Sequence, residues 1–443
     1  MTIETDNVDL TRVGPGTVMG EFMRQYWMPA ILSSELETDG APLRFMLLGE
    51  KLIAFRDSSG RVGVMDHRCP HRCASLFLGR NEEDGIRCIY HGWKFDVDGK
   101  CVDMPSVPAH QDFKDKVHAK AYKTHERAGL IWVYMGSRAE APPLPAFEVF
   151  LSPESETRIS IAQRECNWLQ GLEGDIDTSH LGFLHAGSVD PDDLGEDHPM
   201  HHAVANRAPE YKVTTAEWGT TYGAYREEAD GKLSWRVANF LFPFYTQTPN
   251  TDFAKRVVCN AWVPMDDTHT MMIKVTGGTG NVGNFAYHPM KNGEPIPGSG
   301  NGIRTVPNTT DWYGRFRAIA NPGNDWQIDR QAQRDNIIYS GIHSITGQDQ
   351  AVTESMGGIS DHAFEHLAPS DQMIARSRRS LLIAARAFAE QGTVPPGVDD
   401  PLVYWNARSG SFMADRDTDW RDAYAEHLKS AVRWSDPSRH AAE

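Results

Sequence analysis

The sequence predicts an α+β protein of two domains, a small all-β domain followed by a larger domain that mixes helices with strands. The chain has 443 residues, more than the ~100–200 residues of a usual single domain. Residues 43–136 carry short apolar runs typical of strands, and the Pro-rich "SRAEAPPLPAF" that follows is typical of a linker. Beyond it, helical patterns alternate with strand-like runs such as "RVVCNAWVPM". We therefore expect a helical segment at 1–40 that packs on the larger domain, a β domain at 41–147 and the larger domain at 148–443.

Individual elements follow from local patterns, starting with "TVMGEFMRQYWMPAIL" at 17–32, which predicts a short amphipathic helix. "LRFMLLGEKLIAF", the turn "DSSG" at 57–60 and "RVGVMD" form a hairpin pattern, and "GLIWVYMG" at 129–136 predicts a buried strand.

Two further segments stand out in the larger domain. Apolar residues at helical spacing predict a long helix over 371–390, with Ser370 as its N-cap. Residues 277–310 are rich in Gly, Asn and Pro and predict a long loop, a feature often associated with functional lids.

Charge and composition narrow the classes of partner. The formal net charge of −16 argues against nucleic acid or an anionic membrane surface as the main partner. The N-terminus lacks the basic start and apolar core of a signal peptide, and no apolar run approaches the ~18–20 residues of a membrane span. We expect a cytosolic, cytoplasmic protein.

Four of the six cysteines crowd into residues 69–101, which favours metal chemistry over a disulfide framework. Within "CPHRCASLFLGRNEEDGIRCIYHGWKFD", Cys69 and His71 form C-x-H, and Cys88 and His91 form C-x₂-H. Structural zinc sites usually take paired ligands of one kind, whereas one Cys and one His from each loop fit a two-iron cluster. Spacing alone favours the cluster and leaves zinc as the alternative.

These residues carry a resemblance to a known family. "CPHRCASL…CIYHGWKFDVDGKCVDMPS" resembles the cluster motif of Rieske-type aromatic-ring oxygenases. The resemblance implies a Rieske [2Fe–2S] cluster on Cys69, His71, Cys88 and His91, in a small all-β Rieske domain. One departure is Cys73, where the family usually has glycine.

A second group of metal-binding residues lies in "NWLQGLEGDIDTSHLGFLH" at 167–185. Asp177 and His180 are one helical turn apart, but His185 is turned away on a straight helix by ~140°. Both histidines can reach one metal only if the helix bends or ends between them, and Gly182 is placed to allow this. The spacing resembles the mononuclear iron motif of the same oxygenases, with Asp177 as the bridging carboxylate.

Two histidines and a carboxylate form the facial triad of non-haem Fe(II) oxygenases. "GQDQAVTESMG" at 347–357 resembles the segment that supplies the third ligand, with Asp349 as the matching residue and Glu354 as the fallback. The neighbouring "EHLAPSDQ" is similar to the phthalate dioxygenase branch, whose oxygenases contain one kind of subunit.

The resemblance implies the terminal oxygenase of a multicomponent system. It would use O₂ and electrons from NAD(P)H, delivered by a separate flavin and iron–sulfur reductase or ferredoxin, to hydroxylate an aromatic carboxylate. Cis-dihydroxylation is one form of this reaction. The alternatives are O-demethylation of a methoxylated aromatic acid and a Rieske electron-transfer protein without oxygenase activity. The family also implies a catalytic domain with a central antiparallel sheet, and a homo-oligomer, trimer or hexamer, in which Asp177 links one subunit's iron to its neighbour's His91.

Substrate-binding residues are predicted from chemistry. Arginine pairs with a carboxylate through both oxygens, and Arg207 is the first candidate, with Arg236 and Arg256 behind it. Ser179 could reach the same pocket. "GTGNVG" at 278–283 and "HPMHH" at 198–202 are interpreted as loops, because the first lacks the helix and acidic residue of a dinucleotide site.

Overall fold

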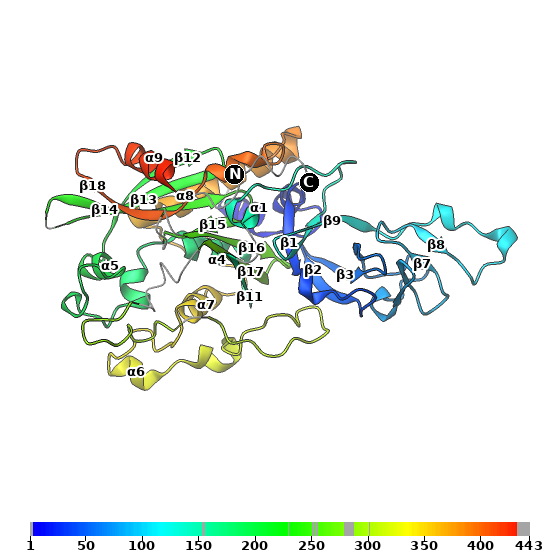
Figure 1. Ribbon diagram of the computed structural model, residues 1–443, viewed down its shortest axis with the longest axis horizontal. Helices are drawn as coiled ribbons and strands as arrows, with labels where there is room; N and C mark the ends of the chain where they lie inside the picture. The colour runs from blue at the N-terminus through cyan, green and yellow to red at the C-terminus, as the bar shows by residue number, and fades with distance from the viewer. Residues whose placement is uncertain are drawn as a thin grey trace.

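The computed structural model describes residues 3–152, 156–228, 230–249, 253, 256–278, 288–300 and 302–431. The molecule is elongated, with strands β7 and β8 at one tip and the large sheet of the C-terminal part towards the other end (Figure 1). Among the described residues, no helix is both long and apolar enough to cross a membrane.

The N-terminal part is built from two antiparallel sheets. The first has the order β1-β10-β9-β4-β3-β2, and the second, at the tip, has the order β5-β6-β7-β8. Their bounds are β1 (Trp27–Leu32), β2 (Leu43–Leu47), β3 (Glu50–Arg56), β4 (Val62–Asp66), β5 (Arg80–Glu82), β6 (Gly85–Arg87), β7 (Lys94–Phe95), β8 (Cys101–Asp103), β9 (Ala121–Arg127) and β10 (Leu130–Tyr134).

The C-terminal part is built on an eight-stranded sheet of order β11-β17-β16-β15-β14-β13-β12, with β18 also paired to β14, and all of these strand pairs are antiparallel. This confirms the predicted α+β class with a central antiparallel sheet. The strands are β11 (Thr157–Arg164), β12 (Glu210–Ala216), β13 (Gly219–Glu227), β14 (Lys232–Leu241), β15 (Tyr245–Gln247), β16 (Arg256–Pro264), β17 (Thr270–Gly278) and β18 (Gly410–Asp415).

Helices cover this sheet and connect it to the N-terminus. They are α1 (Ile3–Thr11), α2 (Val18–Met23), α3 (Glu148–Leu151), α4 (Trp168–Ile176), α5 (His201–Ala205), α6 (Arg330–Arg334), α7 (Ile345–Ser355), α8 (Gln372–Gln391) and α9 (Trp420–Ser430). The predicted long helix is α8, although its N-cap is Asp371 and not Ser370. The described parts of 279–310 contain no helix or strand. Of the segment "GTGNVG", which is interpreted above as a loop, only Gly278 is among the described residues.

The helix predicted over 17–32 is wrong in its second half. α2 ends at Met23, and Trp27–Leu32 forms strand β1, which pairs with β10 about a hundred residues later. All but the last residue of β1 are buried, and a continuous apolar run does not distinguish a buried strand from a helix.

The predicted hairpin contains one more turn than expected. The run "LRFMLLGEKLIAF" is itself split into β2 and β3 by Leu48 and Gly49, which both have positive φ (46° and 76°). A methyl group on Gly49 would come 3.2 Å from Cα of Gly14, so this turn lies directly against the N-terminal segment.

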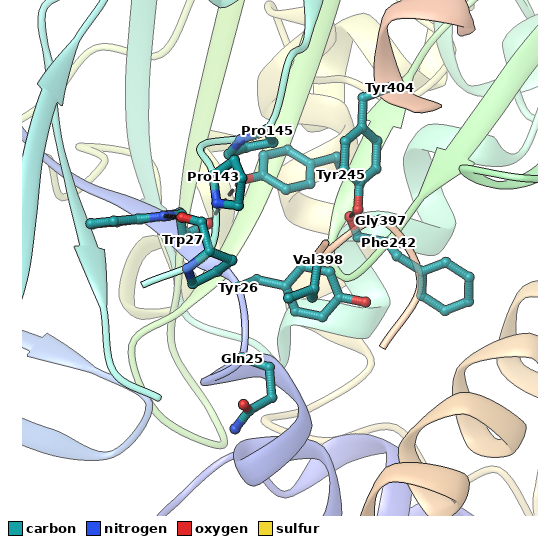
Figure 2. A pocket seen from close by; sticks show the side chains of 11 residues that line it. Gln25, Tyr26, Trp27, Pro143, Pro145, Phe242, Tyr245, Gly397, Val398 and Tyr404 are labelled. Carbon is teal, nitrogen blue, oxygen red and sulfur yellow. Dashed lines mark hydrogen bonds between the residues drawn. The ribbon is translucent and has the colours of Figure 1, made fainter. Parts of the chain in front are cut away.

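The N-terminal segment joins the two parts of the molecule. α1 and α2 contact α8, whereas β1 belongs to the sheet of the N-terminal part. Linker prolines, Trp27 and Tyr404 meet at this junction around a hollow of about 10 Å³, lined by aromatic side chains (Figure 2). That volume is about the space of one water molecule, so the junction is a packed interface and has no room for a substrate.

Candidate active site

The first cluster of metal-binding side chains lies near the tip of the N-terminal part. Cys69 and His71 follow β4, and Cys88 and His91 lie between β6 and β7. Both cysteines are buried, and the rings of His71 and His91 have centroids 4.4 Å apart. His71 stacks on Trp93 at 4.3 Å, which fixes its orientation. The two loops thus bring the four predicted residues to one place.

The chemistry of this donor set fits a two-iron cluster. Nδ1 of His91 is buried and has no hydrogen-bond partner among the described residues, as expected for a nitrogen that binds a metal. Ligands of one tetrahedral zinc ion lie within about 4 Å of one another, because zinc–ligand bonds are about 2.0–2.3 Å. Within the described part of the chain, only His180, His185 and Asp349 bring three ligand atoms within 4.8 Å of one another. The cysteines and histidines of the two loops do not form such a group of three, which agrees with a cluster whose cysteines and histidines bind different irons.

The second cluster consists of those three residues. Nε2 of His180 and Nε2 of His185 are 3.1 Å apart, and Oδ1 of Asp349 lies 3.6 Å and 3.2 Å from them. Ligand atoms at right angles around a metal are about 3.0 Å apart for bonds of about 2.1 Å. The three atoms are therefore spaced as a facial triad requires, and two facing imidazole lone pairs would repel without a cation between them.

The local fold explains how His180 and His185 meet. Helix α4, capped by Asn167, ends at Ile176, so it ends before His180 and not between the histidines as predicted. A π-helical turn spans Leu181–His185, and its wider period brings residues five apart close together. Gly182 allows this turn to pack closely against the backbone at Ala203, because a methyl group at position 182 would come 2.7 Å from the carbonyl oxygen of Ala203.

Asp349 lies in the first half of α7, whose N-cap Ser344 accepts from the Gly347 amide. The fallback ligand Glu354 is occupied elsewhere, because it accepts from Nε1 of Trp326 at 2.6 Å and from the Glu165 amide at 3.0 Å. The geometry therefore favours Asp349 over Glu354 as the third ligand.

Asp177 directly supports His180. Its Oδ2 lies 3.2 Å from Nδ1 of His180, and its Oδ1 accepts from the amide and hydroxyl of Ser179 at 2.7 Å each. Burial opposes ionisation, but the hydrogen bonds from His180 and Ser179 hold the pKa of Asp177 below its usual value. Ser179 is turned to Asp177 and Tyr211 and does not line the cavity described next.

A cavity of about 610 Å³ adjoins the triad and is lined by His180, His185, Asp349 and Asp177. Five basic side chains also line it: Arg164, Arg226, Arg236, Arg256 and Lys274. Arg207, the first candidate for substrate binding, is not among its lining residues. Its guanidinium donates to the carbonyls of Gly187 and Val189 and lies over the ring of Phe183, so the structure does not support Arg207 or Ser179 as substrate contacts.

The sequence analysis does not predict several residues near the site. Among them, Gln348 contacts His185, and Asp175 and Lys274 line the cavity. Gln348 is next to Asp349 and Asp175 is close to Asp177, so proximity to the motifs was an available signal for these two. Lys274 carried no such signal.

The fold and the two clusters define a class: this chain belongs to the Rieske-type non-haem iron oxygenases. Residues 26–122 match the Rieske [2Fe-2S] domain, and residues 133–440 match the domain described as LigXa C-terminal domain like. These matches confirm the resemblance given by the motifs.

Individual relatives agree along nearly the whole chain. It is 49% identical over 434 residues to the 3-chlorobenzoate-3,4-dioxygenase oxygenase subunit of Comamonas testosteroni, covering 98% of this chain and 100% of that protein. It is 34% identical to the phthalate 4,5-dioxygenase oxygenase subunit of Pseudomonas putida (97% and 96% covered). It is 33% identical to the 5,5'-dehydrodivanillate O-demethylase oxygenase subunit of Sphingobium sp. (85% and 78% covered).

The fold is also that of a solved structure, dicamba monooxygenase bound to dicamba, with a TM-score of 0.55 at 16% identity, covering 84% of this chain and 100% of that one. The protein is thus the terminal oxygenase component of a Rieske system, with a Rieske cluster and a mononuclear iron as cofactors and with O₂ and NAD(P)H-derived electrons as co-substrates. The family of the second domain supports this function over that of a Rieske electron carrier without oxygenase activity. Bound iron supplies O₂ activation, and the chain's own groups orient the imidazoles and shape the cavity.

Proposed function

We propose that this oxygenase hydroxylates an aromatic carboxylate, with cis-dihydroxylation as one form of the reaction. Relatives that act on 3-chlorobenzoate and phthalate support this substrate class. In the proposed arrangement, Cys69, His71, Cys88 and His91 hold the cluster, and His180, His185 and Asp349 hold the mononuclear iron.

The observation that carries the proposal is a pair of incompletely satisfied arginines in the cavity. Arg236 has no hydrogen-bond or ion-pair partner among the described residues, and its Nε is buried. Arg226, which is 3% exposed, donates through Nε to the Asn206 carbonyl, but one of its terminal nitrogens has no partner among the described residues. Burial lowers the pKa of both guanidinium groups. A buried charge without a partner is costly, and a substrate carboxylate would satisfy it through a bidentate contact.

A second reaction, O-demethylation of a methoxylated aromatic acid, is favoured by one observation. The relative from Sphingobium is an O-demethylase at 33% identity. The same cavity and the same arginines would bind such an acid, so the two reactions are distinguished by their products: formaldehyde is released only by demethylation.

We also propose a homo-oligomer, a trimer or hexamer, that receives electrons from a reductase or ferredoxin and passes them between subunits. Within one chain the cluster loops lie towards the tip carrying β7, far along the molecule from α4 and α7 (Figure 1). Ile89 and Tyr90, beside His91, are 59% and 55% exposed, which suits a tip that docks on a second copy. Asp177 would then link His180 to His91 of the neighbouring chain.

The test of substrate class is oxygen uptake with benzoate, 3-chlorobenzoate, phthalate and methoxybenzoates, using a surrogate reductase and a parallel formaldehyde assay. Arg236→Met should raise KM for acids strongly, because losing a buried charged contact costs roughly 2–5 kcal/mol. Arg207→Met is the matched control on a guanidinium outside the cavity. Equal turnover of uncharged analogues by the wild-type protein, or a larger effect of the Arg207 variant, would contradict the carboxylate assignment.

A further inference from the structure

A second polar group lines the cavity on strands β16 and β17, apart from the arginine pair. Lys274 on β17 and Asn260 on β16 are register partners, and Asp175 near the end of α4 adjoins them. All three line the cavity. Lys274, Asn260, Thr246 and Phe240 are successive register partners across β17, β16, β15 and β14. Arg236 is therefore three strand spacings from Lys274 and four residues further along β14, about 20 Å between backbones at ~4.8 Å per strand and ~3.4 Å per residue. The side chains of both are long enough to extend into the space between them.

Asp175 is held by one of its two oxygens. Oδ2 accepts from the Thr246 hydroxyl at 2.6 Å, from Nδ2 of Asn260 at 2.7 Å and from Nε1 of Trp262 at 2.8 Å. Oδ1 has no hydrogen-bond partner within the described part of the chain. The carboxylate is therefore fixed in orientation and presents one unused acceptor.

Asn260 and Lys274 also have unused capacity. Asn260 is 4% exposed, and its Oδ1 is shielded from the cavity and has no hydrogen-bond partner among the described residues. Lys274 forms no hydrogen bond or ion pair with any described residue, although its charge is close enough to those of Asp175, Arg256 and Asp349 to interact. Burial lowers the pKa of Lys274 and raises that of Asp175, so both groups lack full hydration.

The groups with unused capacity that reach the cavity are a cationic donor, Lys274, and one acceptor, Oδ1 of Asp175, whereas Asn260 fixes the orientation of Asp175. A carboxylate would accept from the ammonium but face repulsion from Asp175. An apolar group would leave both unsatisfied, at the cost that unpaired buried polar groups carry. A hydroxyl group satisfies both, since it accepts from Lys274 and donates to Asp175.

We infer that Lys274, Asn260 and Asp175 form a binding subsite for a hydroxyl group, so that the preferred substrate is an aromatic acid bearing a hydroxyl group remote from its carboxylate. The inference rests on the proposed function for the carboxylate end alone. It adds a contact with a hydroxyl group of the substrate, away from the arginine pair that would bind the carboxylate.

The test measures ligand binding by isothermal titration calorimetry. The reductase is left out so that no turnover occurs. The probes are benzoate, 3- and 4-hydroxybenzoate and the two corresponding methoxybenzoates. At least one hydroxybenzoate should bind roughly tenfold more tightly than benzoate, the size expected of a hydrogen bond to a charged group. Its methyl ether, which accepts but does not donate, should have an intermediate affinity.

Lys274→Met should reduce this hydroxyl preference to about one, and Lys274→Gln, which keeps a neutral donor, should retain part of it. The control Arg236→Met should weaken all five acids by similar factors and leave the ratio intact. Thermal unfolding of each variant shows whether it is folded, and the Gln variant remains informative if the Met variant is not.

The outcomes separate the inference from the proposed function. If benzoate binds but every hydroxybenzoate binds equally, or if the preference survives in Lys274→Met, the hydroxyl subsite is overturned. If no acid binds, the carboxylate assignment is wrong, and phenol becomes the probe. Phenol binding that is lost in Lys274→Met still supports the hydroxyl subsite. If phenol does not bind to the wild-type protein, the subsite is overturned as well.

Discussion

Nδ1 of His185 lies 2.6 Å from Oε1 of Gln348. The amide of Gln348 is held in this orientation because its Nε2 donates to the carbonyls of Gly298 and Ile342 at 3.2 Å and 2.8 Å. Oε1 can only accept, so Nδ1 of His185 carries the proton and Nε2 is left with a lone pair directed at Asp349 and His180. Gln348 is a positioning residue for a proposed iron ligand.

Replacement of Gln348 should therefore weaken the mononuclear site specifically. Gln348→Leu should lower Fe(II) affinity about 10–100-fold, the usual effect of losing an outer hydrogen bond to a ligating histidine. Gln348→Glu, which keeps an acceptor, should retain most of the affinity. Anaerobic Fe(II) titration measures this, and an unchanged cluster spectrum shows that the fold is intact; full iron affinity in the Leu variant would contradict the positioning role.

Asp349 and Glu354 should give different results on substitution. Asp349→Ala should lose mononuclear iron and turnover while keeping the cluster spectrum. Glu354→Ala should keep iron but destabilise the protein by about 1–3 kcal/mol, because Trp326 and the Glu165 amide lose a buried acceptor. Metal analysis and thermal unfolding of both variants distinguish the roles, and the reverse pattern would show that the third ligand is misassigned.

The cluster should have the potential of a histidine-ligated centre. Two imidazoles in place of thiolates raise the reduction potential to about −150 to +300 mV, compared with about −400 mV for four cysteines. Redox titration followed by EPR measures this value. A potential near the lower figure, or stoichiometric zinc without acid-labile sulfide, is incompatible with Cys69, His71, Cys88 and His91 as Rieske ligands.

Asp177 should be needed for coupled turnover rather than for folding. As a mere cap at the end of α4 its charge would matter little, and Asp177→Asn would remain active. As the link between centres, the same variant should keep its fold, cluster and iron but lose coupled turnover. Rapid-mixing kinetics that follow cluster oxidation should show slower electron transfer, and an unchanged rate would exclude the linking role.

Mixed oligomers test the route between subunits directly. His91→Ala and His180→Ala chains should each be inactive alone. When co-assembled they should regain partial activity, because an intact cluster can then serve an intact iron in the neighbouring chain. No recovery in verified mixed oligomers would contradict the cross-subunit route.

Sequence information was sufficient where the chemistry is local. Cys69 with His71, and His180 with His185, are close in sequence, so spacing and motif already indicated their partners. Strand β1 was missed because its identity depends on pairing with β10, which no local pattern reports. Proximity to the iron motif in the sequence favours Arg207 over Arg236. Arg236 faces the cavity because of its side-chain direction on β14, whereas Arg207 donates to backbone carbonyls instead. Both properties depend on the tertiary structure and not on the local sequence.

The basic cavity lies within a chain whose net charge is −16, and the two have opposite effects on an anionic substrate. At low ionic strength, the long-range field of the protein repels an approaching carboxylate, whereas salt at about 0.1 M reduces the Debye length to ~10 Å and removes most of that repulsion. The arginine contacts form at short range in a partly dehydrated cavity, where screening is weak. Moderate salt should therefore accelerate substrate capture, the reverse of the behaviour expected when a protein's overall field attracts its ligand.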